Sequence, residues 1–377
     1  MIRTKVCFDL TALEMVDRHG GIGRYCASLF AAMRALQPPF DLYALTHGDR
    51  APLRADDVDL AALLRAPLRS VNRHRFSRRL LAPWNLRHMD LFHRPTRWYR
   101  RPARTPTVAT VYDTIALDDA YPGTSASARA RRVKAQVLER ARLKRPQHLI
   151  AISQATKASV CRWSERPEED VSVTHLRLDH AHFYPVDSRA VRAKYALPER
   201  WMVSVGSDHY RKNQALAFAA WRRSGVPDAL VLVGKAIYGD TFSRLVQQAH
   251  AERVADRFRW LQEVDDEDLP ALYSGATCAI APSRSEGFGL TLLEAMACGT
   301  VVLAADHAAY REVAENAARF FTASSEDQLA KLIGASKDGA ARDAWVAKGL
   351  AHAASFTWRA CAEQTIAVYD RLLRRDR

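Results

Sequence analysis

Residues 276–299 read ATCAIAPSRSEGFGLTLLEAMACG and combine three patterns in one stretch. The apolar run over 276–281 is typical of a buried strand, a glycine-containing loop follows it, and a helical pattern begins close to Gly289. Similar strand, loop and helix patterns recur in both halves of the chain. Because strands that alternate with helices form parallel sheets, the sequence predicts an α/β fold with two doubly wound domains.

The alternation of predicted elements sets the domain boundaries. We expect strands over 6–10, 40–45, 107–111, 148–152, 201–205, 229–233, 257–261, 276–281 and 300–304. We expect helices over 22–36, 126–143, 215–223, 241–251, 268–274 and 290–297. The pattern breaks at Phe183, Tyr184 and Pro185, which predicts one domain over 1–185 and a second over 186–355.

Two carboxylates flank the glycine loop of the opening stretch. Glu286 lies where the predicted strand ends, and Glu294 lies inside the following helix. Gly287 and Gly289 allow the backbone to approach a ligand closely, and the first N–H groups of the helix favour an anion. A sugar joined to a diphosphate and a ribose would use both carboxylates and the helix end. Taken singly, Glu286 also fits a helix-terminal acid and Glu294 a surface glutamate.

A second loop places two adjacent cations at a predicted helix start. The run Val205 to Asn213 contains Gly206, Ser207, Arg211 and Lys212. Cations are disfavoured at a helix N-terminus, so their presence indicates a bound polyanion. A diphosphate leaving group needs such a clamp, because negative charge accumulates on it as a glycosidic bond breaks. A solvated basic turn is the alternative interpretation.

The first half offers weaker candidates. Gly20 and Gly21 begin a loop that continues to Arg24, and its backbone amides suit a phosphate or an incoming hydroxyl. The loop lacks the third glycine of a dinucleotide fingerprint, which argues against an NAD-linked dehydrogenase. His93 follows a short apolar run and suits a contact with a sugar or a proton transfer. A histidine with a purely structural role explains this position equally well. Asp113 ends the next predicted strand.

The acidic run over 265–268 contains a DxD pattern formed by Asp266 and Asp268. It directly precedes a predicted helix, so N-capping explains it better than metal binding. We therefore predict no metal site and no resident cofactor.

The net charge of +14 over 377 residues is unevenly distributed. Residues 1–187 hold 31 Lys and Arg against 19 Asp and Glu, whereas residues 188–377 hold 25 against 23. This asymmetry favours an anionic partner for the first half. A nucleic-acid-binding protein is the alternative, but no recognised module is present and aromatics do not interleave with the basic residues. No apolar run reaches the roughly 20 residues that a bilayer crossing needs.

Taken together, these motifs resemble the GT-B retaining glycosyltransferases of family 4. The E-x7-E signature of that family matches Glu286 and Glu294, and its phosphate clamp matches Arg211 and Lys212. The resemblance extends over nearly the whole chain. It implies two Rossmann-like domains facing a cleft, an acceptor-binding domain over 1–185, a nucleotide-sugar-binding domain over 186–355, and a last helix over 356–377 that crosses back onto the first domain.

The resemblance also implies roles for single residues. Arg211, Lys212, Glu286 and His93 would be catalytic. The family often has a His-Asp pair where this chain has Tyr112-Asp113, so His93 is the better match to its donor-sugar histidine. Asp113 and Arg24 would lie on the acceptor side. The donor-binding residues would be Gly20, Gly21, Gly206, Ser207, Arg211, Lys212, Val264, Glu286, Gly287, Phe288, Gly289, Leu290 and Glu294.

The activity implied is a metal-independent, retaining transfer of a hexose from GDP-mannose or a UDP-hexose to a hydroxyl of a glycan or lipid-linked acceptor, in surface polysaccharide or lipopolysaccharide synthesis. No carboxylate is spaced as a dedicated nucleophile, so the protein would act by positioning and charge stabilisation. With no visible secretory signal and no paired cysteine spacing, we expect a cytoplasmic protein. Its basic first half would attach to the anionic inner face of the membrane, with no nucleic acid as partner.

Overall fold

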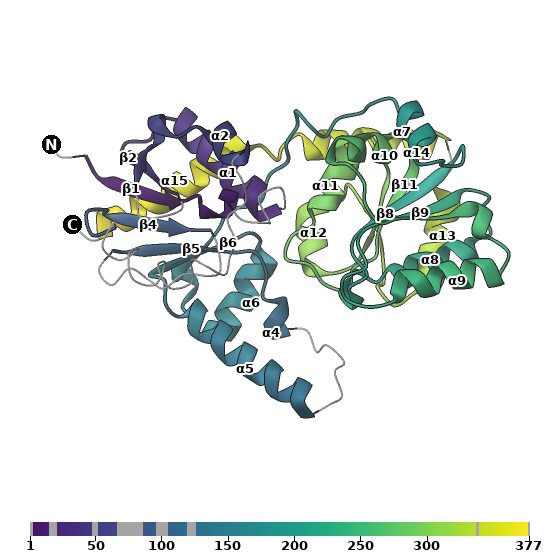
Figure 1. Ribbon diagram of the computed structural model, residues 1–377, viewed down its shortest axis with the longest axis horizontal. Coiled ribbons are helices and arrows are strands. Elements are labelled where there is room, and N and C mark those ends of the chain that lie inside the picture. The colour runs from purple at the N-terminus through teal and green to yellow at the C-terminus, as the bar shows by residue number, and fades with distance from the viewer. Residues whose placement is uncertain are drawn as a thin grey trace. The chain divides into compact units, whose positions relative to one another are not determined.

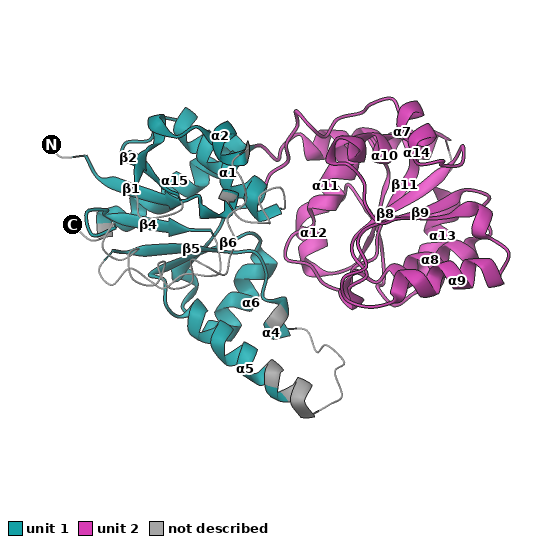
Figure 2. Cartoon of the chain, viewed as in Figure 1, with its two compact units in different colours: residues 1–176, 358–377 teal, residues 177–357 magenta. Residues whose placement is uncertain are grey.

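The computed structural model describes residues 3–14, 21–46, 52–65, 86–95, 105–118, 126–336 and 339–375. The chain divides into two compact units (Figure 2). Unit 1 comprises residues 1–176 and 358–377, and unit 2 comprises residues 177–357. Each unit is an α/β domain with its own sheet (Figure 1). The sequence-based prediction of two doubly wound domains is therefore confirmed.

Unit 1 contains a sheet with the strand order β3-β2-β1-β4-β5-β6-β7. Its strands are β1 (Lys5–Asp9), β2 (Asp41–Leu45), β3 (Leu53–Arg54), β4 (Leu91–Arg94), β5 (Thr107–Val111), β6 (His148–Ala151) and β7 (Val171–Val173). All neighbouring pairs are parallel except β2 with β3. Its helices include α1 (Gly21–Ala35), α2 (Leu60–Arg65), α4 (Ile115–Asp118), α5 (Ala126–Leu143), α6 (Gln154–Ser164) and α15 (Trp358–Arg375).

Unit 2 contains a fully parallel sheet with the strand order β10-β9-β8-β11-β12-β13. Its strands are β8 (Trp201–Val205), β9 (Ala229–Val233), β10 (Phe258–Leu261), β11 (Ala276–Ala281), β12 (Val302–Ala305) and β13 (Arg319–Phe321). Its helices include α7 (Arg189–Lys194), α8 (Gln214–Ser224), α9 (Thr241–Ala251), α10 (Leu269–Ser274), α11 (Leu290–Ala297), α12 (Ala308–Ala314), α13 (Glu326–Ala335) and α14 (Gly339–Ala353).

Parallel pairing explains why these strands are apolar. β9 and β5 are buried along their whole length, as expected for strands covered by helices on both faces of a sheet. In unit 2 the chain order reverses between β8 and β11, which are neighbours in the sheet. Ligands of open α/β sheets bind outside the carboxyl ends of the strands at such a reversal. The loops after β8 and β11 are therefore the first place to look for a site.

The chain passes from unit 1 into unit 2 near residue 177 and returns to unit 1 near residue 357. The amide of Leu178 donates to the carbonyl of Phe356 at 3.3 Å, and Phe183 is buried in unit 2. Residues 177–185 therefore belong to unit 2, so the chain enters that unit before the predicted boundary at residue 185. Helix α15 belongs to unit 1, where it packs against α1 (Figure 2).

Candidate functional site

The loops after β8 and β11 are bound together by main-chain and amide contacts. After β8 the chain forms a short 3-10 turn, Tyr210–Lys212, which ends at Asn213 with a left-handed φ of 53°. The side-chain amide of Asn213 donates to the carbonyls of Pro282 and Ala323, each at 3.0 Å. The amide of Arg284 donates to the carbonyl of Arg211 at 2.8 Å. These bonds fix the cation-bearing loop against the Glu286 loop.

The predicted cations and the first predicted carboxylate form one cluster. Lys212 Nζ lies 2.8 Å from Glu286 Oε1, and the Arg211 guanidinium pairs with Oε2 of the same carboxylate. Arg211 also donates to the carbonyl of Ser285 at 2.9 Å. Burial raises the pKa of Glu286, but the adjacent Lys212 and Arg211 outweigh it and leave that pKa below its ordinary value. Glu286 is therefore a buried carboxylate that stays ionised between two cations.

Gly206 and Gly234 follow β8 and β9, where there is little room for a side chain. A Cβ on Gly234, whose φ is +151°, would lie 2.2 Å from the carbonyl oxygen of Gly206. A Cβ on Gly206 would lie 3.2 Å from Cδ of Lys212. Side chains at these two positions would therefore push apart the ends of β8 and β9 and displace Lys212. Ser207, the next predicted donor-binding residue, is half-buried in the same loop.

Gly289 is the N-cap residue of α11 and lies against Tyr310 of α12. Its φ is +125°, and a Cβ there would lie 2.8 Å from the ring of Tyr310. Gly287 and Phe288 are buried, and Leu290 is half-buried. The ring of Phe288 packs against Phe356. These residues can therefore offer a ligand mainly their backbone, as predicted for a close approach.

His307 is a residue at this edge that sequence reasoning missed. It follows β12, the strand next to β11, and caps α12 by accepting a hydrogen bond from the amide of Tyr310. Its ring lies 4.1 Å from the Tyr310 ring. Burial, opposed by the nearby Glu286 carboxylate, lowers the pKa of His307 to about 4. A lone histidine with no partner at a characteristic spacing gives no sequence signal, and only the fold brings it beside Glu286.

Glu294 occupies a separate position within α11. It is half-buried, and the hydroxyl of Tyr273 donates to its Oε2 at 3.2 Å. Val264 lies in the loop after β10, the edge strand on the far side of β9. The structure thus brings Arg211, Lys212 and Glu286 into direct contact. Glu294 lies on α11 and Val264 in the loop after β10 of the same unit.

His93 does not occupy the position predicted for it. It lies in β4 and is completely buried. Its Nε2 lies 2.8 Å from Oγ1 of Thr110, and its Nδ1 is hydrogen bonded to the hydroxyl of Tyr369 in α15. Burial lowers the pKa of His93 to about 3. Because both ring nitrogens are occupied, we correct the prediction of a catalytic histidine: His93 joins α15 to the sheet of unit 1.

The other unit 1 candidates are placed as follows. Gly20 lies outside the described residues, and Gly21 is the exposed first residue of α1. Arg24 is half-buried in the first turns of the same helix. Asp113 follows β5, and its carboxylate accepts from the amide of Ile115 at 3.1 Å. Gly21, Arg24 and Asp113 therefore remain predictions for the acceptor side.

The acidic run before α10 ends at Asp268, the residue at the N-cap position of that helix. Asp268 makes no capping hydrogen bond and instead accepts from Lys194 Nζ at 2.6 Å and from the hydroxyl of Tyr195 at 2.7 Å. Asp268 therefore occupies the predicted cap position without making the capping hydrogen bond. Within the described ranges, no group of three or more His, Cys, Asp and Glu residues could hold a metal ion.

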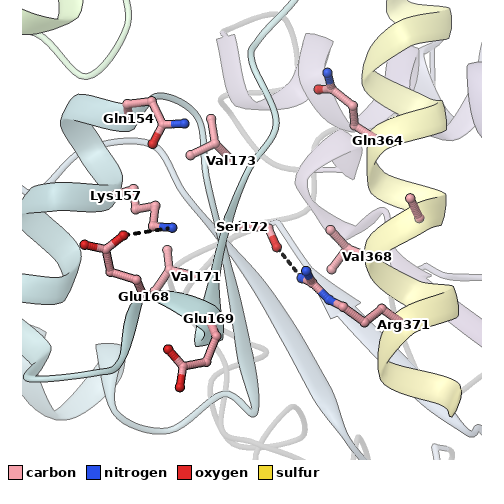
Figure 3. Close-up of a pocket in the computed structure, with 11 residues that line it drawn as sticks. Gln154, Lys157, Glu168, Glu169, Val171, Ser172, Val173, Gln364, Val368 and Arg371 are labelled. Carbon is pink, nitrogen blue, oxygen red and sulfur yellow. Dashed lines mark hydrogen bonds and ion pairs between the residues drawn. The ribbon is translucent and has the colours of Figure 1, made fainter. Parts of the chain in front are cut away.

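A cavity of about 480 Å³ lies in unit 1, between β7 and α15 (Figure 3). Lys157 and Glu168 form an ion pair at 3.5 Å on one side of it. On the other side, Arg371 donates to Oγ of Ser172. None of the predicted site residues lines this cavity, so it is separate from the cluster around Glu286.

Comparisons with known proteins give this geometry a context. Residues 187–350 match the family model described as glycosyl transferases group 1, and this range contains the whole cluster around Glu286. The chain is also 27% identical over 373 residues to O-antigen chain mannosyltransferase B from Escherichia coli, an alignment that covers 93% of this chain and 95% of the relative. Residues 187–350 of the chain belong to the group 1 glycosyltransferases.

Solved structures show the fold of this glycosyltransferase. Sucrose-phosphate synthase from Thermosynechococcus elongatus matches with a TM-score of 0.72 at 21% identity, over 98% of this chain and 99% of that one. HepE from Anabaena, solved with UDP and glucose, also matches with a TM-score of 0.72, at 18% identity over 98% of this chain and 100% of that one. The glycosyltransferase therefore has the GT-B fold. No helix in the described segments is both long and apolar enough to span a bilayer.

Proposed function

We propose that this glycosyltransferase moves a hexose, with retention of configuration and without a metal, from a nucleotide-diphosphate sugar to a hydroxyl of a glycan or lipid-linked acceptor in surface polysaccharide synthesis. The observation that carries the proposal is the convergence of Arg211 and Lys212 on Glu286. Two cations on one loop match two phosphate groups, and a carboxylate on the facing loop matches sugar hydroxyls.

The cluster also explains how the leaving group would be stabilised. Arg211 and Lys212 are only 17% and 22% exposed, so their attraction to phosphate oxygens is weakly screened by water. When the bond from the sugar to the diphosphate breaks, negative charge accumulates on the diphosphate. The cations, paired with Glu286 in the absence of a ligand, would transfer their hydrogen bonds to the phosphate oxygens.

Retention is implied by the resemblance to the retaining family, and the proposed site argues against a covalent intermediate. Glu286 is held by two cations, and Glu294 accepts a hydrogen bond from Tyr273. A covalent intermediate would need a carboxylate aligned behind the sugar carbon. We therefore infer that the acceptor hydroxyl attacks on the same face as the leaving group, whose phosphate oxygen removes the hydroxyl proton. Positioning and charge stabilisation supply the catalysis.

GDP-mannose and a UDP-hexose are the two donors considered. The name of the E. coli relative, O-antigen chain mannosyltransferase B, favours mannose and O-antigen synthesis. The UDP and glucose in the HepE structure make a UDP-sugar the other choice. Isothermal titration with GDP, UDP, GDP-mannose and UDP-glucose, followed by hydrolysis assays with and without EDTA, tests donor and metal independence together. Absence of binding to every nucleotide would refute the proposal.

A membrane surface is the second proposed partner, and α5 supports it. Val133, Val137 and Leu138 on this helix are 58%, 60% and 48% exposed, and the exposed Lys134 and Arg140 flank them. Exposed valines beside cations suit a helix that lies in the interface of an anionic bilayer. Flotation with neutral and anionic liposomes tests this. Equal binding to both kinds of vesicle would remove anionic lipid as a partner.

A further inference from the structure

His307 presents a buried hydrogen-bonding atom with no partner. Its Nε2 is shielded from solvent and makes no hydrogen bond to any described residue. Buried polar atoms are almost always paired, and an unpaired one in a folded protein calls for an explanation. The residue is half-buried as a whole and follows β12, the strand next to β11, at the edge of the sheet where the Glu286 loop begins.

The other ring nitrogen determines which atom carries the proton. Nδ1 accepts a hydrogen bond from the amide of Tyr310, so in the neutral ring the hydrogen is on Nε2. Because the pKa of His307 is lowered to about 4, chiefly by burial, the ring is neutral near pH 7. His307 therefore offers one N–H donor in a fixed direction, held by the cap of α12 and by the Tyr310 ring.

The groups around this donor indicate what it would bind. The carboxylate of Glu286 and the guanidinium of Arg211 lie near enough to affect the charge state of His307. A phosphate has only acceptor oxygens near pH 7, and the Glu286 carboxylate would repel it. A sugar hydroxyl can donate to a carboxylate and accept from an N–H at the same time. The pairing of a carboxylate with a neutral N–H donor thus fits hydroxyls.

We propose that His307 is a donor-sugar contact: its Nε2–H donates to an oxygen of the hexose whose hydroxyl hydrogen is accepted by Glu286. This inference rests on the proposed function, because it places the hexose of the nucleotide sugar beside Glu286. In the proposed complex Arg211 moves from Glu286 to the diphosphate, which frees Glu286 to accept the hydroxyl hydrogen. His307 then adds affinity for the sugar and none for the nucleoside diphosphate.

The test compares ligands with and without the sugar. His307→Phe keeps a ring against Tyr310 and removes the donor, whereas His307→Gln retains an N–H near the position of Nε2. Isothermal titration measures binding of GDP and GDP-mannose, or of UDP and UDP-glucose, whichever pair the unaltered protein binds. His250→Phe, at an exposed position in α9, is the matched control.

We expect His307→Phe to weaken binding of the sugar nucleotide about five- to tenfold, as for the loss of one hydrogen bond, and to leave binding of the diphosphate within about twofold. His307→Gln should restore most of the loss, and His250→Phe should change neither. An unchanged affinity for the sugar nucleotide, or equal losses for both ligands, would overturn the inference. If the unaltered protein binds no nucleotide, the proposed function fails instead. Retained diphosphate binding also reports that the variant is folded.

Discussion

The two units contain sheets of the same kind but use their polar residues differently. In unit 2, charged residues meet at the carboxyl ends of β8 and β11, where Arg211 and Lys212 hold the ionised Glu286. In unit 1, His93 lies near the end of β4 and is hydrogen bonded to Tyr369 and Thr110 inside the core. The same kind of sheet thus holds a cluster of ion pairs in unit 2 and a buried, hydrogen-bonded histidine in unit 1.

The largest effect should come from breaking the unit 2 cluster. Lys212→Ala removes one of two cations from the proposed leaving group, so kcat/KM should fall about 10²- to 10³-fold. Steady-state kinetics with the donor found by titration measures this. Arg244→Ala, which removes an exposed cation of α9 that pairs with Asp240, is the control and should stay near the activity of the unaltered enzyme. Similar activity for both variants would contradict the clamp.

Removing the buried hydrogen bonds of His93 in unit 1 should lower stability and leave nucleotide binding intact. His93→Ala leaves a cavity and removes the partner of Thr110 and Tyr369, so the free energy of unfolding should fall by about 2–4 kcal/mol. Urea denaturation measures the loss, and titration with the nucleoside diphosphate checks the proposed site. A variant as stable as the parent with impaired donor binding would instead return His93 to the proposed site.

Acidification should reveal the neutral His93 in the core of unit 1. The pKa of His93 is about 3 in the folded protein, below the ordinary value of 6.5. The unfolded chain therefore binds a proton that the folded one does not, and stability should fall as pH decreases from 6.5 towards 3, by about 1.4 kcal/mol per pH unit from this residue. In unit 2, His307 with a pKa of about 4 adds a loss over the same range. Glu286, whose pKa is depressed, stabilises the fold above its ordinary value of 4.5 and loses that contribution only as pH falls further. Urea denaturation at pH 7, 6 and 5 should show a shallower pH dependence for His93→Phe, whereas an unchanged slope would contradict the burial of a neutral His93.

The smallest effect should concern the exposed apolar residues. Val133→Asp combined with Val137→Asp places charge on α5, and we expect binding to anionic vesicles to weaken about tenfold. Ile237→Asp is the matched control in unit 2, because Ile237 is 64% exposed and Val137 is 60% exposed. Liposome flotation measures both variants. Equal loss in both would show that the attachment does not depend on α5.

The sequence predicted the regular elements well where their patterns are long. The helices α5, α9 and α11 have the predicted bounds, because their apolar residues recur at helical spacing over eight or more positions. The strands β7 and β13 were not predicted. Each has only three residues, too few for a periodicity to be recognised.

Candidate site residues could be predicted only where charged residues stand at recognisable positions of the sequence pattern. Arg211, Lys212 and Glu286 were found because two cations and a carboxylate stand at predicted strand ends. His93 was misassigned because its decisive partner, Tyr369, lies 276 positions away in the sequence. His307 and Asn213 were missed for the same reason: their environment is assembled from separate strands of the sheet, and their neighbours in sequence say nothing of it.

The membership of α15 in unit 1 has a consequence for the order in which the protein matures during synthesis. Unit 2 is encoded as one continuous segment, so it can fold while the ribosome is still adding residues. Unit 1 lacks Tyr369, the partner of His93, until residues 358–375 have emerged. The part of the chain that is translated first is thus completed last. A chain truncated before residue 358 would contain a complete unit 2 and an incomplete unit 1.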